Sequence, residues 1–401
     1  MARFIAIPVT KGDAFYLDRD DLSVLVDGGQ DRLGFASTFE TTTGSDGVGV
    51  IVCTHNDADH ANGVLGFLQG GLRCDEIWLP GRWLNVLPDL LKPFVEVFAE
   101  LAKNVTEVEV PSEREQRRSG LPAIEAYADH LLERFDDAPA SQHFSPIGED
   151  GWPESYLHIF DDAKTREIAP FARWWPQGDR PPWPDFTYRI YSRLGPHALE
   201  LLWSAIESAR RIRTIAMEAF HRGIRVRWFE FDAMKPSGGI EGLQPINARA
   251  IVGVRPFVGR LLDWLALTVS NRESLVFWSP PTDNHPGVLF TADSDLSRLN
   301  LPHQLVNAIV TSPHHGAEDN AKAYQEVGKA ARQNVSSITW VRSDCRYRGR
   351  PGQTYLSLSS QRLCTICRLG GGMWSPKRPV HLSSRGGTWV PQPATALCSC
   401  Q

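Results

Sequence analysis

The feature that most constrains the fold is a dense cluster of metal-binding residue types directly after an apolar run. The cluster comprises His55, Asp57, Asp59 and His60, and it follows the apolar residues 48–53. Such a run predicts a buried strand, so the cluster has its backbone anchored in the core. In an extended segment residues two apart share a face, so His55 and Asp57 can converge on one ion. Asp59 and His60, at a turn into a helix, can serve a second ion, although Asp59 is also a suitable helix N-cap.

Two later segments supply further ligands of the same kinds. Asp293 follows the apolar residues 288–290, and the pair His314 and His315 follows the next predicted strand at residues 308–311. An Asp at a strand end usually belongs to a turn. Here a carboxylate in that position can bridge two ions, and a histidine at a strand end can complete the coordination shell.

The chain divides by pattern into four parts. Residues 1–84 read as short strands and turns, with a short helix expected over residues 61–69. Residues 85–244 form a mainly helical insertion, with helices expected at residues 90–101, 121–135 and 197–222 and a Trp/Pro-rich loop at residues 171–184. Strand patterns resume in residues 245–340, and residues 341–401 form a basic, cysteine-rich extension.

The order and identity of the ligand residues resemble the metallo-β-lactamase superfamily, and specifically its ComEC-like branch, the nuclease-like domain of competence proteins and its stand-alone relatives. The resemblance covers about residues 1–84 and 245–340. It implies an α/β fold, an αββα metallo-β-lactamase sandwich, here with a large helical insertion and a small Cys-containing C-terminal extension. The matching motifs are Lys11-Gly12-Asp13-Ala14, Leu25-Val26-Asp27-Gly28-Gly29, residues 54–63, Thr291-Ala292-Asp293 and Ser312-Pro313-His314-His315-Gly316.

The resemblance also implies roles for the site residues. It assigns His55 and Asp57 to a first metal, Asp59 and His60 to a second, Asp293 to a bridge between them, and His314 or His315 to the second site, with Asp27 as a structural carboxylate behind the metal loop. The implied cofactors are one or two divalent ions, zinc or manganese. Asp57 stands where the superfamily usually has a histidine, which resembles the ComEC-like branch and favours phosphodiester over lactam chemistry. No residue matches the superfamily's middle ligand histidine.

The cysteines are unevenly distributed. Of seven, five lie near the C-terminus, and the pairs Cys364/Cys367 and Cys398/Cys400 resemble the two knuckles of a zinc ribbon. These four are therefore candidate ligands of a structural zinc, for which His381 or Cys345 could substitute at one position. Unrelated free thiols are the alternative.

Charge is uneven as well. Residues 341–401 carry nine basic residues and one acidic residue, so the remainder of a chain with net charge −5 carries −13. This asymmetry predicts contact between the basic extension and nucleic acid, although a solvated basic tail would have the same composition. With no long apolar segment and no signal-peptide pattern, we expect a cytoplasmic protein without a membrane partner.

The sequence therefore predicts a metal-dependent hydrolase, a phosphodiesterase or nuclease using a metal-bound hydroxide. Asp59 and His315 are the candidate catalytic residues for transferring the leaving-group proton. One alternative is a hydrolase of a small molecule such as a cyclic nucleotide, thioester or lactam, which the acidic body and the Trp-rich stretch favour. A second alternative is a non-catalytic interaction module with a degenerate metal site, which the unmatched histidine favours.

Overall fold

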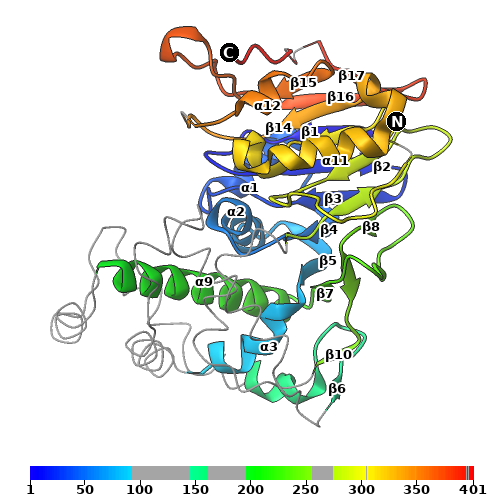
Figure 1. The fold of residues 1–401 in the computed structure, drawn as a ribbon. Helices are drawn as coiled ribbons and strands as arrows, with labels where there is room; N and C mark the ends of the chain where they lie inside the picture. Colours follow the sequence, from blue (N-terminus) through cyan, green and yellow to red (C-terminus); the bar gives the residue numbers. More distant parts are fainter. Residues whose placement is uncertain are drawn as a thin grey trace. The chain divides into compact units, whose positions relative to one another are not determined.

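The computed structural model describes residues 1–92, 144–160, 196–254 and 274–401, except positions 304, 348, 394 and 396. It is a mixed α/β structure that divides into two compact units (Figure 1). The first unit comprises Met1–Gly81, Arg222–Ile251 and Asn271–Gln401, and the second comprises Arg82–His221 and Val252–Ser270.

The first unit contains a nine-stranded sheet in the order β17-β16-β1-β2-β3-β4-β5-β7-β9. Its inner strands β3, β4, β5 and β7 are parallel, and the remaining pairs are antiparallel. The strands are β1 (Arg3–Ala6), β2 (Phe15–Arg19), β3 (Leu22–Val26), β4 (Gly47–Val52), β5 (Arg73–Pro80), β7 (Arg225–Phe231), β9 (Ala248–Ala250), β16 (Val380–Arg385) and β17 (Thr388–Pro391).

The other described strands of this unit form a six-stranded sheet in the order β15-β14-β13-β12-β11-β8. The strands from β12 to β15 run parallel, whereas β11 is antiparallel to both of its neighbours. The strands are β8 (Gln244–Pro245), β11 (Phe277–Ser279), β12 (Val288–Phe290), β13 (Ile309–Thr311), β14 (Thr339–Arg342) and β15 (Gln361–Cys364).

The two sheets share one hydrophobic core. Phe4 and Phe15 of the first sheet stack with ring centroids 5.9 Å apart, and both rings contact Phe290 of the second sheet. Val50 and Val341 belong to the same buried cluster. Because successive side chains of a strand point to opposite faces, alternate residues of each sheet build this core.

Helices cover the outer faces of both sheets. Tyr16 of β2 packs edge-on against Phe39 of α1 (Phe35–Thr43), and Phe39 in turn contacts Phe67 of α2 (Ala58–Gln69). On the second sheet, Trp340 of β14 contacts Tyr324 of α11 (Ala321–Ala331), with ring centroids 4.9 Å apart. The short helix α12 (Gln353–Leu356) contributes Tyr355 to the same buried cluster.

The first turns of α2 are held against the end of β3 by a close approach of two backbones. Gly28 donates its N–H to the carbonyl oxygen of His60 at 2.9 Å, and Gly63 donates to that of Gly29 at 2.8 Å. A Cβ atom at Gly63 would lie 1.8 Å from the Gly28 carbonyl oxygen. Glycine is therefore required here, and its presence fixes the position of the metal-binding cluster relative to the sheet.

The second unit contains most of the segment expected to be helical. The predicted helix at residues 197–222 corresponds to α9 (Pro196–His221), and α3 (Gly81–Leu90) begins at the boundary between the units. Phe220 stacks on Phe160 with ring centroids 4.3 Å apart, and β6 (Ser145–Pro146) pairs with β10 (Gly253–Val254). The Trp/Pro-rich stretch, the helix predicted at residues 121–135 and most of that predicted at residues 90–101 lie outside the described residues.

The first unit also contains the predicted short helix and the basic C-terminal residues. The short helix expected over residues 61–69 corresponds to α2, which begins three residues earlier, at Ala58. The basic residues 341–401 contribute β15 to the second sheet and β16 and β17 to the first. In the described part of the chain, no helix has the length and apolarity needed to cross a membrane.

Candidate metal centres

The histidine and carboxylate side chains gather where strands of both sheets end. His55 follows β4, Asp293 follows β12, and His315 lies in the short 3-10 helix η2 (Pro313–Gly316) after β13. Because β12 and β13 are parallel, their carboxyl ends lie at the same edge of the second sheet. His60 reaches this edge from the first turn of α2, and Asp13 reaches it from the turn between β1 and β2.

His60 is held in position by a buried chain of hydrogen bonds. Its Nδ1 lies 2.8 Å from Oδ2 of Asp27, which also accepts the hydroxyl of Thr54 at 2.7 Å. The other oxygen of Asp27 accepts the backbone N–H of Thr54 at 2.8 Å. Asp27 thus fixes the ring of His60 and directs Nε2 away from itself, as expected for a residue that supports a metal ligand.

His315 has an equivalent support. Its Nδ1 lies 2.8 Å from Oδ1 of Asp13, and both side chains are fully buried or nearly so. This contact joins residues that are 302 positions apart in the sequence. It directs Nε2 of His315 towards Asp293, whose Oδ1 lies 3.8 Å from that nitrogen.

Asp13, His60, Asp293 and His315 form a group in which one ligand atom of each lies within 4.8 Å of the others. Four of their buried polar atoms meet no hydrogen-bond geometry, although Nε2 of His60 lies only 3.2 Å from Oδ1 of Asp293: they are Oδ2 of Asp13, Nε2 of His60, Oδ1 of Asp293 and Nε2 of His315. An unsatisfied buried polar atom costs about 1–3 kcal/mol. Nε2 of His60, Nε2 of His315 and Oδ1 of Asp293 face one another and are a suitable donor set for a divalent cation, whereas Asp13 lies behind His315 at Nδ1.

A second group, His55, Asp57 and Asp293, adjoins the first and shares Asp293 with it. Nε2 of His55 lies 3.8 Å from Oδ2 of Asp57 and 3.8 Å from Oδ2 of Asp293, and it too is buried without a hydrogen bond. Burial, followed by the nearby His60, lowers the pKa of His55 to about 4. We call the two overlapping groups together the His/Asp centre. In it, Oδ1 of Asp293 faces Nε2 of His60 and His315, and Oδ2 faces Nε2 of His55 and His314.

The charges of the His/Asp centre favour a cation. Burial opposes protonation of His60, but Asp293 and Asp27 outweigh it and raise the pKa well above the ordinary value. At His315 burial again opposes protonation, and Asp13 and Asp293 nevertheless raise the pKa to about 10. The raised pKa values of both rings favour their protonated forms, whose positive charge balances the buried carboxylates. A metal ion can take the place of those protons, and its binding would release them.

Three residues of the predicted set, His314, His315 and Asp59, differ in how they are placed relative to the two ligand groups. His315 belongs to the first group, whereas His314 is partly exposed and has Nε2 3.6 Å from Oδ2 of Asp293. Among the described residues, neither group includes Asp59, whose Oδ2 lies 3.1 Å from Nζ of Lys11 and 3.5 Å from Nε2 of His315. Asp59 is thus beside the centre, with its carboxylate charge paired to a lysine.

Sequence reasoning did not assign a site role to Asp13 or Lys11. Asp13 stands in a Gly-Asp pair typical of a turn, and nothing within that turn indicates a partner 302 residues away. Gly12 has a φ of 95°, and a Cβ there would lie 1.6 Å from the carbonyl oxygen of Asp59. The glycine is therefore needed to bring the turn against α2, and it and the matching motif at residues 11–14 were the available signals.

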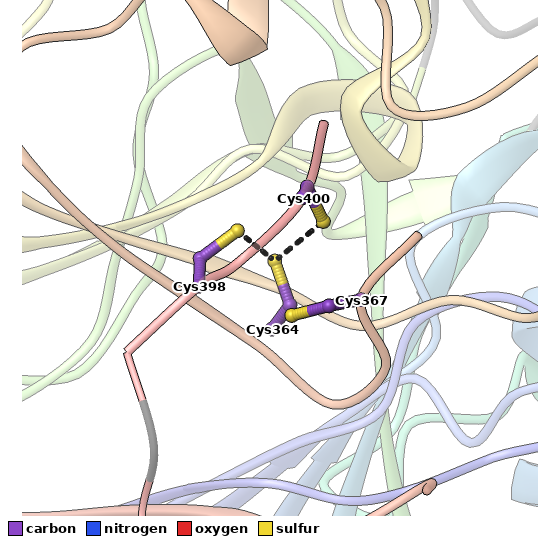
Figure 2. A group of neighbouring side chains, drawn as sticks. All are labelled: Cys364, Cys367, Cys398 and Cys400. Atoms are coloured by element: carbon purple, nitrogen blue, oxygen red, sulfur yellow. Dashed lines mark hydrogen bonds between the residues drawn. The ribbon is translucent and has the colours of Figure 1, made fainter. Parts of the chain in front are cut away.

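A separate group consists of the four C-terminal thiols, which we call the cysteine centre. Cys364 ends β15, Cys367 lies in the following turn, and Cys398 and Cys400 approach from the end of the chain (Figure 2). Sγ of Cys364 lies 3.2 Å from that of Cys398 and 3.9 Å from that of Cys400. The four sulfur atoms all lie within 4.8 Å of one another. Neither Cys345 nor His381 is a member of this group of described residues.

No family model matches this chain, and no curated protein matches it either. The His/Asp centre offers nitrogen and oxygen ligands at a partly open edge, and the cysteine centre offers four sulfurs in a closed arrangement. These are the two donor sets that typically distinguish catalytic from structural metal sites.

Proposed function

We propose that this chain is a metal-dependent hydrolase of the ComEC-like branch of the metallo-β-lactamase superfamily, and that it cleaves phosphodiesters. The observation that carries the proposal is the shared carboxylate Asp293, whose two oxygens face the nitrogens of two adjoining ligand groups. Two face-to-face sheets with helices on both outer faces agree with an αββα sandwich. The residues at the carboxyl strand ends match the motifs on which the resemblance is based.

The donor set suits zinc or manganese. His60 and His315, each with its Nδ1 beside a carboxylate, would present Nε2 to one ion, together with Asp293. His55 and Asp57 would hold a second ion on the other side of Asp293. When bound, such ions lower the pKa of water and neutralise negative charge on the group that is attacked. A phosphodiester benefits from both effects.

Basic side chains near the His/Asp centre suit an anionic substrate. Lys11 pairs with Asp59 at its edge. Lys11 and Arg350 interact electrostatically with Cys345. Lys377 interacts with both Cys345 and Arg346. Arg346 and Lys377 are exposed. Lys11, Arg346 and Lys377 could contact the phosphates that flank a scissile bond, which is how the basic C-terminal part would bind nucleic acid.

The remaining roles follow from position. Asp27 and Asp13 hold the rings of His60 and His315 in the orientation that directs Nε2 at the site. His314, partly exposed beside Asp293, can transfer a proton to a leaving alkoxide, since its ring is free to reach solvent. Asp59, with its charge held by Lys11, orients that lysine towards the substrate rather than acting as a base.

The test uses the full-length chain loaded with manganese or zinc and assayed on bis(p-nitrophenyl) phosphate, a cyclic nucleotide and a chromogenic lactam. We expect turnover of the phosphodiesters and a loss of ~10³-fold in His315→Asn, equivalent to about 4 kcal/mol. His303→Asn, which changes an exposed histidine, is the matched control. Turnover of the lactam alone, or full phosphodiester turnover in His315→Asn, would refute the proposal.

A further inference from the structure

The surroundings of the cysteine centre contain features that free thiols do not need. Arg342 at the end of β14 is fully buried, and its Nη2 donates to the carbonyl oxygen of Ile366, between Cys364 and Cys367, at 2.7 Å. Its Nε is buried without a hydrogen bond. Its Nη1 donates to Oδ2 of the buried Asp344 at 2.9 Å, and Cys364 also acts electrostatically on the guanidinium. A buried guanidinium at this place is suited to lie beside ionised sulfurs.

Hydrogen-bond donors also point at the sulfurs. The backbone N–H of Ser399 donates to Sγ of Cys367 at 3.4 Å. The buried hydroxyl of Tyr355 lies 3.2 Å from Sγ of Cys364, in a contact in which either atom can be the donor. Donors to sulfur are the usual outer partners of metal-bound thiolates, because they stabilise the ionised form.

The sulfur positions fit one ion better than disulfides. Zinc in a tetrahedral site lies about 2.3 Å from each sulfur, which places the sulfurs ~3.8 Å apart. The observed separations of 3.2 and 3.9 Å, with all four sulfurs within 4.8 Å, bracket that value. A disulfide would use two of the thiols, whereas all four share one centre here. Four thiolates and no nitrogen or oxygen ligand select zinc over magnesium or manganese.

We propose that Cys364, Cys367, Cys398 and Cys400 bind one structural zinc ion, and that this ion fastens the end of the chain to the edge strand β15. The backbone already follows that edge: Cys398 donates its N–H to the carbonyl oxygen of Arg362 at 2.9 Å, and Gln401 donates to that of Arg368 at 3.0 Å. The final residues thereby cover an edge that would otherwise expose unpaired backbone groups. Arg342 offsets part of the double negative charge of a zinc ion with four thiolates.

The experiment measures zinc in the full-length chain after dialysis against a mild chelator that strips the more open His/Asp centre. The wild type and Cys345→Ser should retain about one zinc per chain, and the double variant Cys398→Ser/Cys400→Ser should retain none. Cys345 is the matched control because it lies in the same part of the chain but outside the cysteine centre. Equal zinc retention in all three proteins would overturn the proposal.

A second measurement covers the case in which the double variant fails to fold. Wild-type protein refolded with cobalt should show sulfur-to-cobalt charge-transfer absorption in the near ultraviolet, which nitrogen and oxygen ligands do not give. Absence of that absorption, or isolation of the wild type with iron in place of zinc, would overturn the assignment. Neither result depends on catalysis, so the proposal stands or fails separately from the hydrolase function.

Discussion

The His/Asp centre and the cysteine centre differ in how completely their ligand atoms are enclosed. In the His/Asp centre several buried nitrogens and oxygens lack hydrogen bonds, while His314 and Asp57 keep part of their surface exposed. In the cysteine centre each sulfur faces the other three, and donors or a buried cation lie behind them. An open position is typical of a metal that handles substrate, and a closed set of four is typical of a metal that holds the chain together.

The two centres also differ in backbone strain. Asp27, Ala292, His314 and His315 all have positive φ angles, between 46° and 57°. Such conformations are uncommon for residues other than glycine and tend to cluster at functional sites. Among the described residues from Cys364 onwards, the positive φ angles belong to glycines. Four of the nine positive-φ residues other than glycine in the described chain thus lie at the His/Asp centre, and none lies in the part from Cys364 onwards.

The largest effect should come from the carboxylate shared by both groups of the His/Asp centre. Asp293→Asn should reduce phosphodiester turnover by ~10³-fold or more, because both ions lose a charged ligand at once. Steady-state kinetics and elemental analysis measure this. Asp295→Asn is the matched control, since among the described residues Asp295 accepts its side-chain hydrogen bonds from Ser297, outside the His/Asp centre. Unchanged metal content and turnover in Asp293→Asn would remove the basis of the comparison.

Next in size is the effect of opening the cysteine centre. Cys398→Ser should destabilise the fold by about 2–3 kcal/mol, or a melting temperature lower by roughly 5 °C or more, because the end of the chain is released. Turnover of the folded protein, measured well below that temperature, should stay within about twofold of wild type. A Cys398→Ser protein with normal melting but lost turnover would show that the division between the two centres is wrong.

The carboxylate behind His315 should have a smaller effect than the ligands themselves. Asp13→Asn keeps the shape but removes the charge that orients His315, and should lower metal affinity and turnover by ~10–100-fold. Metal titration followed by activity measures both quantities. Asp18→Asn, at the half-exposed ion pair with Arg3, is the control within the same hairpin and should change neither. If Asp13→Asn behaves like that control, His315 needs no support from Asp13.

The smallest effect concerns the strained backbone beside Asp293. Ala292 has a φ of 46°, so Ala292→Gly should raise the free energy of unfolding by about 0.5–1 kcal/mol. Ala292→Val should lower it, because a β-branched residue tolerates this conformation less well. Thermal melts of the metal-free proteins measure both. Destabilisation by glycine would mean that the strain argument for this centre is wrong.

Much of the His/Asp centre could be predicted from the sequence, because several of its residues are close together along the chain. An apolar run followed by alternating ligand types predicts a strand that ends at a metal-binding turn. His55 and Asp57 fall in one group as that local pattern requires, and His60 lies in the adjoining group with its ring centroid 4.0 Å from that of His55. The mixed α/β class and the helix at residues 197–222 follow from periodicity in the same way, since period and burial are encoded residue by residue. The spacing of Cys364 and Cys367 is equally local.

The tertiary structure decided what depends on contacts between distant segments. The pairing of Asp13 with His315 spans 302 residues, and the choice between His314 and His315 depends on the backbone conformation of η2. The meeting of Cys398 with Cys364 requires the chain end to return along β15. Local sequence states which residues can bind a metal. Packing of two sheets against each other decides which of them meet, because it fixes the positions of segments that have no local relation.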